Sequence, residues 1–266
     1  MTIQKVDVHC HVDLYSTGEL ETIFRDDSCL VVGAATGFDS GERLLQLAEQ
    51  YQNLRVCLGI HPEKPEGYLE LERVMEQIST NIDRIVAIGE IGLPWYCLKQ
   101  MNASEKFVMR KRVDELLVCF LKLARKTDLP VILHAIMETA PFALEQLKEH
   151  RIERALFHWF KGSLPDLEQI IKTGYFISIS PDLMNNKAYA EFTDNIPLDS
   201  LTLESDGPWE YGRSRGMPVM IETTATYLAE RRGLDPEEVL KASLENSLKL
   251  FGSESLIGKD IVILSH

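Results

Sequence analysis

Eight short segments with β-strand composition recur along this chain of 266 residues, and amphipathic stretches separate most of them. They span residues 3–9, 29–35, 54–60, 85–89, 130–134, 155–158, 174–178 and 200–204. Several, such as CLVV, VILH and YFISI, are apolar on both faces, as is typical of parallel strands covered by helices. Eight strands that alternate with helices predict an α/β fold, a closed (β/α)8 TIM barrel. An open doubly wound sheet is the alternative architecture.

Helical periodicity is clear in the longer separating stretches. Residues 42–51 and 105–126 carry apolar side chains at intervals of three and four. The last helix also has start signals: Gly233 ends its predecessor, Asp235 is placed to cap it, and Pro236 suits its first turn. We expect this helix to end near Leu250.

The composition indicates one folded unit. The chain is 45% hydrophobic and contains no internal repeat, low-complexity run or Pro/Gly-rich linker, so a single core is expected. We assign residues 1–252 to the barrel and residues 253–266 to a C-terminal tail of unknown role. The strand-like IVIL of this tail is expected either to dock on the barrel or to pair with a partner.

Targeting and charge narrow the functional classes. No apolar signal region opens the sequence and no stretch approaches 18 uninterrupted apolar residues, so a cytoplasmic protein without membrane contact is expected. The five cysteines show no C-x-x-C spacing and are expected to be reduced. The net charge of −13 is opposite to the basic footprint of proteins that grip nucleic acid along its length. Any phosphate chemistry must therefore lie at a local site.

Polar side chains concentrate where the strands end. The first strand, in VDVHCHVD, directs Asp7, His9, His11 and Asp13 to one side, because alternate residues of a strand share a face. Further histidines and acids follow later strands, namely His61, Glu90, His134, His158 and Asp206. The carboxyl ends of barrel strands meet at one mouth, so these side chains are expected to converge.

The ligand types indicate the chemistry. Histidine and carboxylates without thiolate suit Zn²⁺, Mn²⁺ or Mg²⁺, and four histidines with two carboxylates are too many for one ion with an open position. Two divalent metal ions are therefore predicted, with Glu90 as a bridge because a carboxylate has two oxygens. Such a pair, about 3.5–4 Å apart, suits hydrolysis.

Six motifs in order resemble those of a known family. The strings VDVHCHVD, LGIHPE, AIGEIGLPWY, LPVILHAI, FHWFKGS and LESDGPW are similar to the successive motifs of the TatD-type metal-dependent deoxyribonucleases, a branch of the amidohydrolase superfamily. The resemblance continues to Gly252. It implies a (β/α)8 barrel, a two-metal centre and hydrolysis of phosphodiester bonds, with exonuclease-like trimming of DNA as the usual activity.

The resemblance also implies roles for individual residues. One ion is expected on His9, His11, Glu90 and Asp206, and the second on Glu90, His134 and His158. Asp206 is the expected proton acceptor from the nucleophilic water, and His61 is expected to face the scissile phosphate or its leaving oxygen. Asp13 and Glu204 are expected to orient ligand imidazoles.

The sequence departs from the family pattern at positions that are expected to lie near the substrate. Pro94 stands where the family usually has Asp, and Ile136 stands where it often has Arg. Lys161 replaces a small hydroxyl residue beside His158. Candidate substrate contacts in this chain are His61, Lys161, Trp209, Arg213 and Arg215.

Three functions are compatible with these features. The first is a two-metal deoxyribonuclease that trims single-stranded or frayed DNA ends, because the sequence offers no long band of Lys and Arg for duplex binding. The second is a small-molecule amidohydrolase or esterase on the same barrel, which the acidic charge and the missing Arg favour. The third is a barrel kept as a non-catalytic interaction partner, which a broken ligand set would favour.

Overall fold

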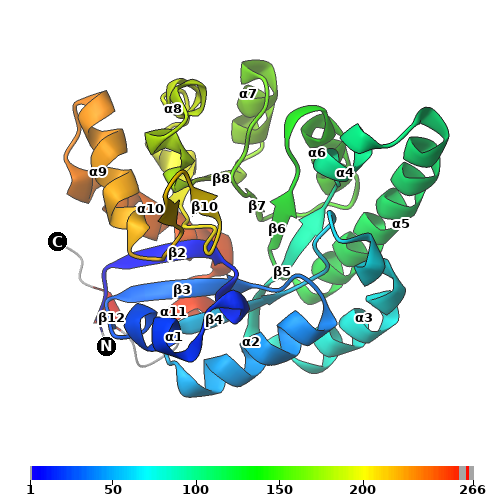
Figure 1. Cartoon of the computed structure of the whole chain (residues 1–266), viewed down its shortest axis with the longest axis horizontal. Coiled ribbons are helices and arrows are strands. Elements are labelled where there is room, and N and C mark those ends of the chain that lie inside the picture. The colour runs from blue at the N-terminus through cyan, green and yellow to red at the C-terminus, as the bar shows by residue number, and fades with distance from the viewer. Residues whose placement is uncertain (1, 258–261, 264–266) are drawn as a thin grey trace.

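The predicted barrel is confirmed by a computed structural model that describes residues 2–257 and 262–263 (Figure 1). Eight parallel strands form one sheet whose spatial order follows the chain without reversal, which excludes the doubly wound alternative. The strands are β2 (Lys5–Cys10), β3 (Cys29–Ala34), β4 (Leu54–Leu58), β5 (Ile85–Gly92), β6 (Val131–His134), β7 (Ala155–Phe157), β8 (Phe176–Ile179) and β9 (Leu201–Leu203).

Helices surround this sheet on its outer face (Figure 1). They are α1 (Thr17–Ile23), α2 (Phe38–Gln50), α3 (Leu71–Thr80), α4 (Trp95–Gln100), α5 (Ala103–Thr127), α6 (Ala140–Glu149), α7 (Leu164–Lys172), α8 (Lys187–Thr193), α9 (Met220–Arg232), α10 (Pro236–Phe251) and α11 (Ser253–Ile257).

Element bounds agree with the sequence signals at most ends. Each of the eight expected segments overlaps one strand, and α10 begins at Pro236 as predicted. The Asp235 side chain accepts a hydrogen bond from Glu237 N, and the Glu238 carboxylate accepts one from Asp235 N. The largest difference is in β5, which runs three residues further than expected, so that Glu90 lies inside a strand.

The barrel closes between its first and last strands through side-chain and loop contacts. Ser205 donates from N and Oγ to the Asp7 carboxylate, at 2.9 and 2.5 Å. At the mouth, Asp206 N donates to His9 O and His11 N donates to Gly207 O. A Cβ on Gly207 would lie 2.0 Å from the Tyr15 hydroxyl, so this close approach requires glycine. Asp7 therefore holds the seam and does not join the site that the VDVHCHVD pattern suggested.

The two ends of the described chain lie side by side on the outside of the barrel (Figure 1). Strand β1 (Thr2–Ile3) pairs in parallel with β12 (Val262–Ile263), which places part of the predicted IVIL strand against the amino terminus. The rest of the predicted tail, 258–261 and 264–266, lies outside the described residues. Assignment of residues 253–266 as a separate tail stays a prediction.

All five cysteines are free thiols, and Cys10, Cys29 and Cys57 are buried in strands. Within the described ranges, none of the helices combines the length and apolar character needed to cross a membrane.

Candidate metal centre

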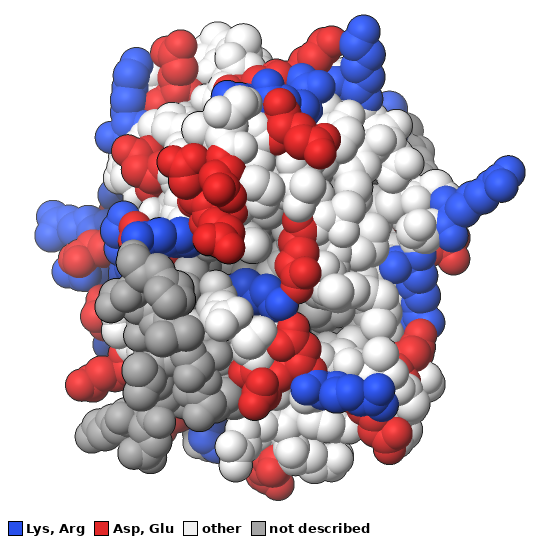
Figure 2. Space-filling view, turned by 90° about the vertical axis from the view of Figure 1, so that its left-hand side faces the viewer, with Lys and Arg blue, Asp and Glu red and all other residues white. Residues whose placement is uncertain are grey.

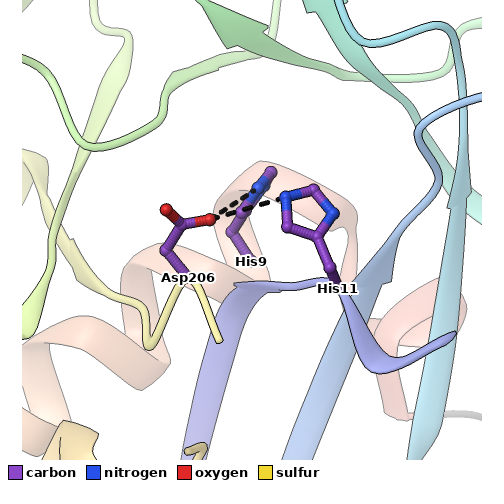
Figure 3. Close-up of side chains that lie close together, drawn as sticks. All are labelled: His9, His11 and Asp206. Carbon is purple, nitrogen blue, oxygen red and sulfur yellow. Dashed lines mark ion pairs between the residues drawn. The ribbon is translucent and has the colours of Figure 1, made fainter. Parts of the chain in front are cut away.

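Two strand ends on either side of the seam contribute the first group of predicted ligands. His9 is the last residue but one of β2 and His11 follows that strand, while Asp206 follows β9 (Figure 3). Their side chains point toward one another, with Asp206 Oδ1 at 3.5 Å from His9 Nε2 and 3.6 Å from His11 Nε2. These three side chains lie close enough to hold one metal ion.

Glu90 connects this group to the remaining predicted ligands. Its Oε2 lies 3.4 Å from His9 Nε2 and 3.6 Å from His11 Nε2. Its Oε1 lies 3.2 Å from His158 Nε2 and 3.0 Å from His134 Nδ1. His61 Nε2 also lies near Oε1, at 3.4 Å. The two oxygens thus face different imidazoles, which is the arrangement expected of a bridging carboxylate.

Unpartnered buried atoms support a metal in this space. His9 Nε2 and Glu90 Oε2 are buried, face the same space and make no hydrogen bond in the described structure. Leaving such an atom without a partner costs about 1–3 kcal/mol, so their occurrence together requires an explanation. A divalent cation that accepts their lone pairs supplies one, and a set of nitrogen and oxygen ligands without sulfur suits Zn²⁺, Mn²⁺ or Mg²⁺.

The outer hydrogen bonds of two imidazoles leave Nε2 available as a ligand. His11 Nδ1 lies 2.9 Å from Ala34 O, and His158 Nδ1 lies 3.3 Å from Glu204 Oε2. Because a carbonyl and a carboxylate accept hydrogen bonds, each Nδ1 carries the proton and each Nε2 presents a lone pair. Glu204 therefore orients His158 as predicted. The expectation for Asp13 is wrong, because the Ala34 carbonyl holds His11 in its place.

His61 has the opposite tautomer. Its Nδ1 accepts a hydrogen bond from Glu63 N at 3.1 Å, so the proton of the neutral ring lies on Nε2, 3.4 Å from Glu90 Oε1. Burial lowers the pKa of His61 to about 3, which keeps the ring neutral. His61 thus offers a donor toward the centre, as the role predicted for it near the phosphate or leaving oxygen requires.

The two central carboxylates differ in proton affinity. Burial raises the pKa of Glu90, but the imidazoles of His61 and His158 and a hydrogen bond from His134 reverse this effect and lower it well below its ordinary value. Burial raises the pKa of Asp206 well above its ordinary value, and Glu204 and Glu90 add to that rise. Glu90 is therefore the more readily ionised of the two carboxyl groups.

A cavity of about 460 Å³ opens above these ligands. His11, His61, His134, His158 and Asp206 form its floor. Its walls are mostly apolar or aromatic and include Leu14, Tyr96, Ile136, Trp159, Pro208 and Trp209. Tyr96 and Trp209 are half exposed there, which leaves flat ring surfaces open to a bound molecule.

The predicted substrate contacts divide into two groups. Lys161 and Trp209 line the cavity together with His61. Lys161 Nζ lies 3.1 Å from Asp182 Oδ2 and 3.9 Å from the centre of the Trp159 ring.

The two predicted arginines lie outside the cavity wall. Arg215 forms an ion pair with Glu19 and lies over the Tyr15 ring. Arg213 is exposed in the turn between β10 (Glu210–Tyr211) and β11 (Ser214–Arg215). The structure therefore brings Lys161 and Trp209 to the ligands but leaves both arginines outside the lining.

Glu63 is a site residue that sequence reasoning missed. Its carboxylate accepts hydrogen bonds from Tyr96 N and Cys97 N, at 2.8 and 2.7 Å, and its Oε1 lies 3.4 Å from His134 Nε2. Burial raises the pKa of Glu63, but these three partners lower it to about 2. The available signal was its position two residues after His61, at the end of a strand.

Comparisons with known proteins agree with this geometry. A family model described as TatD related DNase matches residues 6–252. An uncharacterised metal-dependent hydrolase of Haemophilus influenzae is 32% identical over 250 residues, which cover 92% of this chain and 98% of that protein. The human deoxyribonuclease TATDN3 is 29% identical over 262 residues, which cover 92% of this chain and 94% of that protein.

A solved structure shows the same similarity in three dimensions. The crystal structure of YjjV, a TatD homologue from Escherichia coli, matches with a TM-score of 0.79 at 28% identity. The match covers 94% of this chain and 99% of that one. The resemblance predicted from the six motifs is thus confirmed over nearly the whole chain.

Proposed function

The chain belongs to the TatD-related DNase family and is a metal-dependent hydrolase, and from this premise we propose that it cleaves DNA phosphodiester bonds at two divalent ions. The observation that carries the proposal is the set of six ligands, complete around Glu90, with buried ligand atoms that have no other partner. The name of the human relative, a deoxyribonuclease, supports DNA as the substrate. A non-catalytic barrel is disfavoured because none of the six ligands is missing.

The proposed ligand roles follow the two faces of Glu90. One ion would be held by His9, His11, Glu90 and Asp206, and the other by Glu90, His134 and His158. Divalent ions there supply positive charge that polarises the phosphodiester and acidifies the attacking water.

The proton transfers of the reaction are assigned to side chains of the protein. Asp206 accepts the proton of the attacking water, because its carboxylate lines the cavity beside His9 Nε2 and His11 Nε2. His61 donates from Nε2 toward the phosphate or the leaving oxygen, because its Nδ1 is occupied by Glu63 N.

The cavity favours the end of a DNA strand as substrate. Its volume of about 460 Å³ and its aromatic walls suit one or two stacked nucleotides rather than a duplex. The whole chain carries a net charge of −13. On the face shown in Figure 2, the side of the molecule on which β12 lies, Lys and Arg are interspersed with Asp and Glu. We therefore propose trimming of single-stranded or frayed DNA ends, with weak affinity and a shallow salt dependence.

Closed circles test this preference. Linear single-stranded DNA should be consumed in Mn²⁺ or Mg²⁺, while covalently closed single-stranded circles of the same sequence survive. Efficient cutting of the circles, or tight duplex binding with a steep salt dependence, would contradict the proposal.

One observation favours a second candidate, a small-molecule esterase or amidohydrolase. Lys161 lines the cavity but is paired with Asp182, so the cavity offers few free cations to a polyanion. Rates on small carboxylic esters and amides, measured beside single-stranded DNA at equal metal concentration, decide between the two.

A further inference from the structure

A cationic segment lies beside the cavity in this otherwise acidic chain. Residues 94–112 contain five cationic side chains and one acidic side chain, although the net charge of the whole chain is −13. The cationic ones are Lys99, Lys106, Arg110, Lys111 and Arg112. The segment comprises α4 and the first turns of α5, which follow the mouth end of β5. It therefore lies at the end of the barrel where the ligands converge.

Three of these cations lie on α4, which lines the cavity, and on the start of α5, which follows it. Helix α4 lines the cavity through Tyr96 and Gln100, and Lys99 lies on the same short helix, with Nζ 4.9 Å from the centre of the Trp95 ring. The next helix, α5, presents Lys106 and Arg110 one turn apart, about 6 Å along its axis.

The direction of Lys106 and Arg110 follows from helical spacing. They occupy the same stripe of α5 as Val113 and Leu117, which are buried against the barrel. Arg110 accordingly lies over the ring of Phe142 in α6, with Cζ 5.8 Å from its centre. Both cations thus face the rim of the barrel while remaining exposed.

In the described part of the chain, these cations make no direct ion pair with a carboxylate, although Lys99 and Lys106 interact electrostatically with Glu138, and Arg110 with Asp114. Lys161 is paired with Asp182, and Arg215 is paired with Glu19. Among the residues that the structure describes, Lys99, Lys106 and Arg110 form no such ion pair. The nearby acid, Glu138, accepts a hydrogen bond from Trp95 Nε1. Three cations beside an anion-cleaving site are therefore available to an external anion.

We propose that Lys99, Lys106 and Arg110, here called the cationic rim, bind the phosphates of single-stranded DNA where the strand leaves the cavity across α4. This inference rests on the proposed function and extends it. The cavity holds only the terminal nucleotides, so the rest of the strand must lie on the outer surface, and phosphates are the groups that Lys and Arg recognise without regard to sequence. The rim is short, which fits two or three phosphates of a strand and not a long duplex.

A charge-reversal pair tests the rim. The variant Lys106→Glu/Arg110→Glu is compared with Lys122→Glu/Lys126→Glu, which changes two exposed cations with the same spacing at the far end of the same helix. Binding of fluorescein-labelled dT20 is followed by fluorescence anisotropy at several salt concentrations. Hydrolysis of an unlabelled thymidine dinucleotide reports on the metal centre.

We expect the rim variant to bind dT20 roughly ten-fold more weakly, with a log–log salt slope shallower by about 1.4, because two phosphate contacts on a single strand are lost. Its dinucleotide hydrolysis and the dT20 affinity of the control variant should stay near wild type. Equal affinities and slopes in both variants would overturn the rim while leaving the proposed function intact. If the wild-type protein cleaves neither dT20 nor the thymidine dinucleotide, the proposed function is refuted, and the proposed role of the cationic rim is refuted with it.

Discussion

Glu90 is fully buried, and five imidazole nitrogens lie within 3.6 Å of its two oxygens. A carboxylate in this position sets both the charge of the centre and the separation of any ions it bridges. His61 offers one hydrogen bond to the same centre through Nε2. The two residues should therefore differ greatly in their effect on catalysis.

We predict that Glu90→Gln loses far more activity than His61→Ala. Loss of a general acid such as His61 lowers the rate about 10²–10⁴-fold, whereas loss of the bridging negative charge disturbs the whole metal centre. Values of kcat on linear single-stranded DNA, with metal content measured for each variant, check this. If the His61 variant is the less active while both bind metal normally, the assignment of roles is wrong.

The ion pair of Lys161 with Asp182 leads to a second prediction about single residues. Asp182→Asn should release Lys161 for contact with a phosphate and lower the KM for single-stranded DNA, whereas Lys161→Ala should raise it and make the salt slope shallower by about 0.7. Steady-state kinetics over a salt series measure both. If the KM values of the two variants change in the same direction, or do not change, Lys161 has only a structural role over the Trp159 ring.

Helix α4 has only six residues, and Glu63 holds its first turn from a different part of the chain. Short helices have little stability of their own, so this anchor determines where the Tyr96 wall of the cavity lies. We predict that Glu63→Gln raises the KM for DNA more than it lowers kcat, because a neutral amide cannot accept both backbone N–H groups as strongly.

Hydrogen exchange provides the corresponding structural readout. Amides of residues 95–100 should exchange faster in Glu63→Gln than in wild type, while those of β6 stay protected. Unchanged exchange in α4 together with a changed KM would show that Glu63 acts on the substrate directly and not through the helix.

Elements differ in how far the sequence predicts them. The eight strands were predictable because they are largely buried on both faces and most of them read as a short apolar run. The convergence of their terminal histidines and acids followed from barrel geometry alone. The anchor of α4 was not predictable, because Glu63 and Tyr96 are 33 residues apart and no periodicity relates them. The role of Asp7 was not predictable either, since its partner Ser205 lies 198 residues away across the seam.

For the whole molecule, closure of the barrel depends on that seam. The Asp7 carboxylate accepts hydrogen bonds from Ser205 N, Ser205 Oγ and His9 N in a fully buried position. We predict that Asp7→Asn lowers the free energy of unfolding by about 1–3 kcal/mol, because its amide nitrogen cannot accept from Ser205.

Urea denaturation measures this change, with Asp13→Asn as the control. Asp13 is also buried, but its Oδ1 has no hydrogen-bond partner in the described structure. A free energy of unfolding for Asp7→Asn within about 0.5 kcal/mol of wild type would show that other contacts close the barrel.

The central claim concerns two ions around one buried carboxylate, and anomalous scattering tests it most directly. Crystals of the full chain saturated with Mn²⁺ should show two peaks, about 3.5–4 Å apart, with Glu90 between them. His9, His11 and Asp206 should lie on one side, and His134 and His158 on the other. A single peak under saturating metal, with His134 and His158 uncoordinated, would contradict the account.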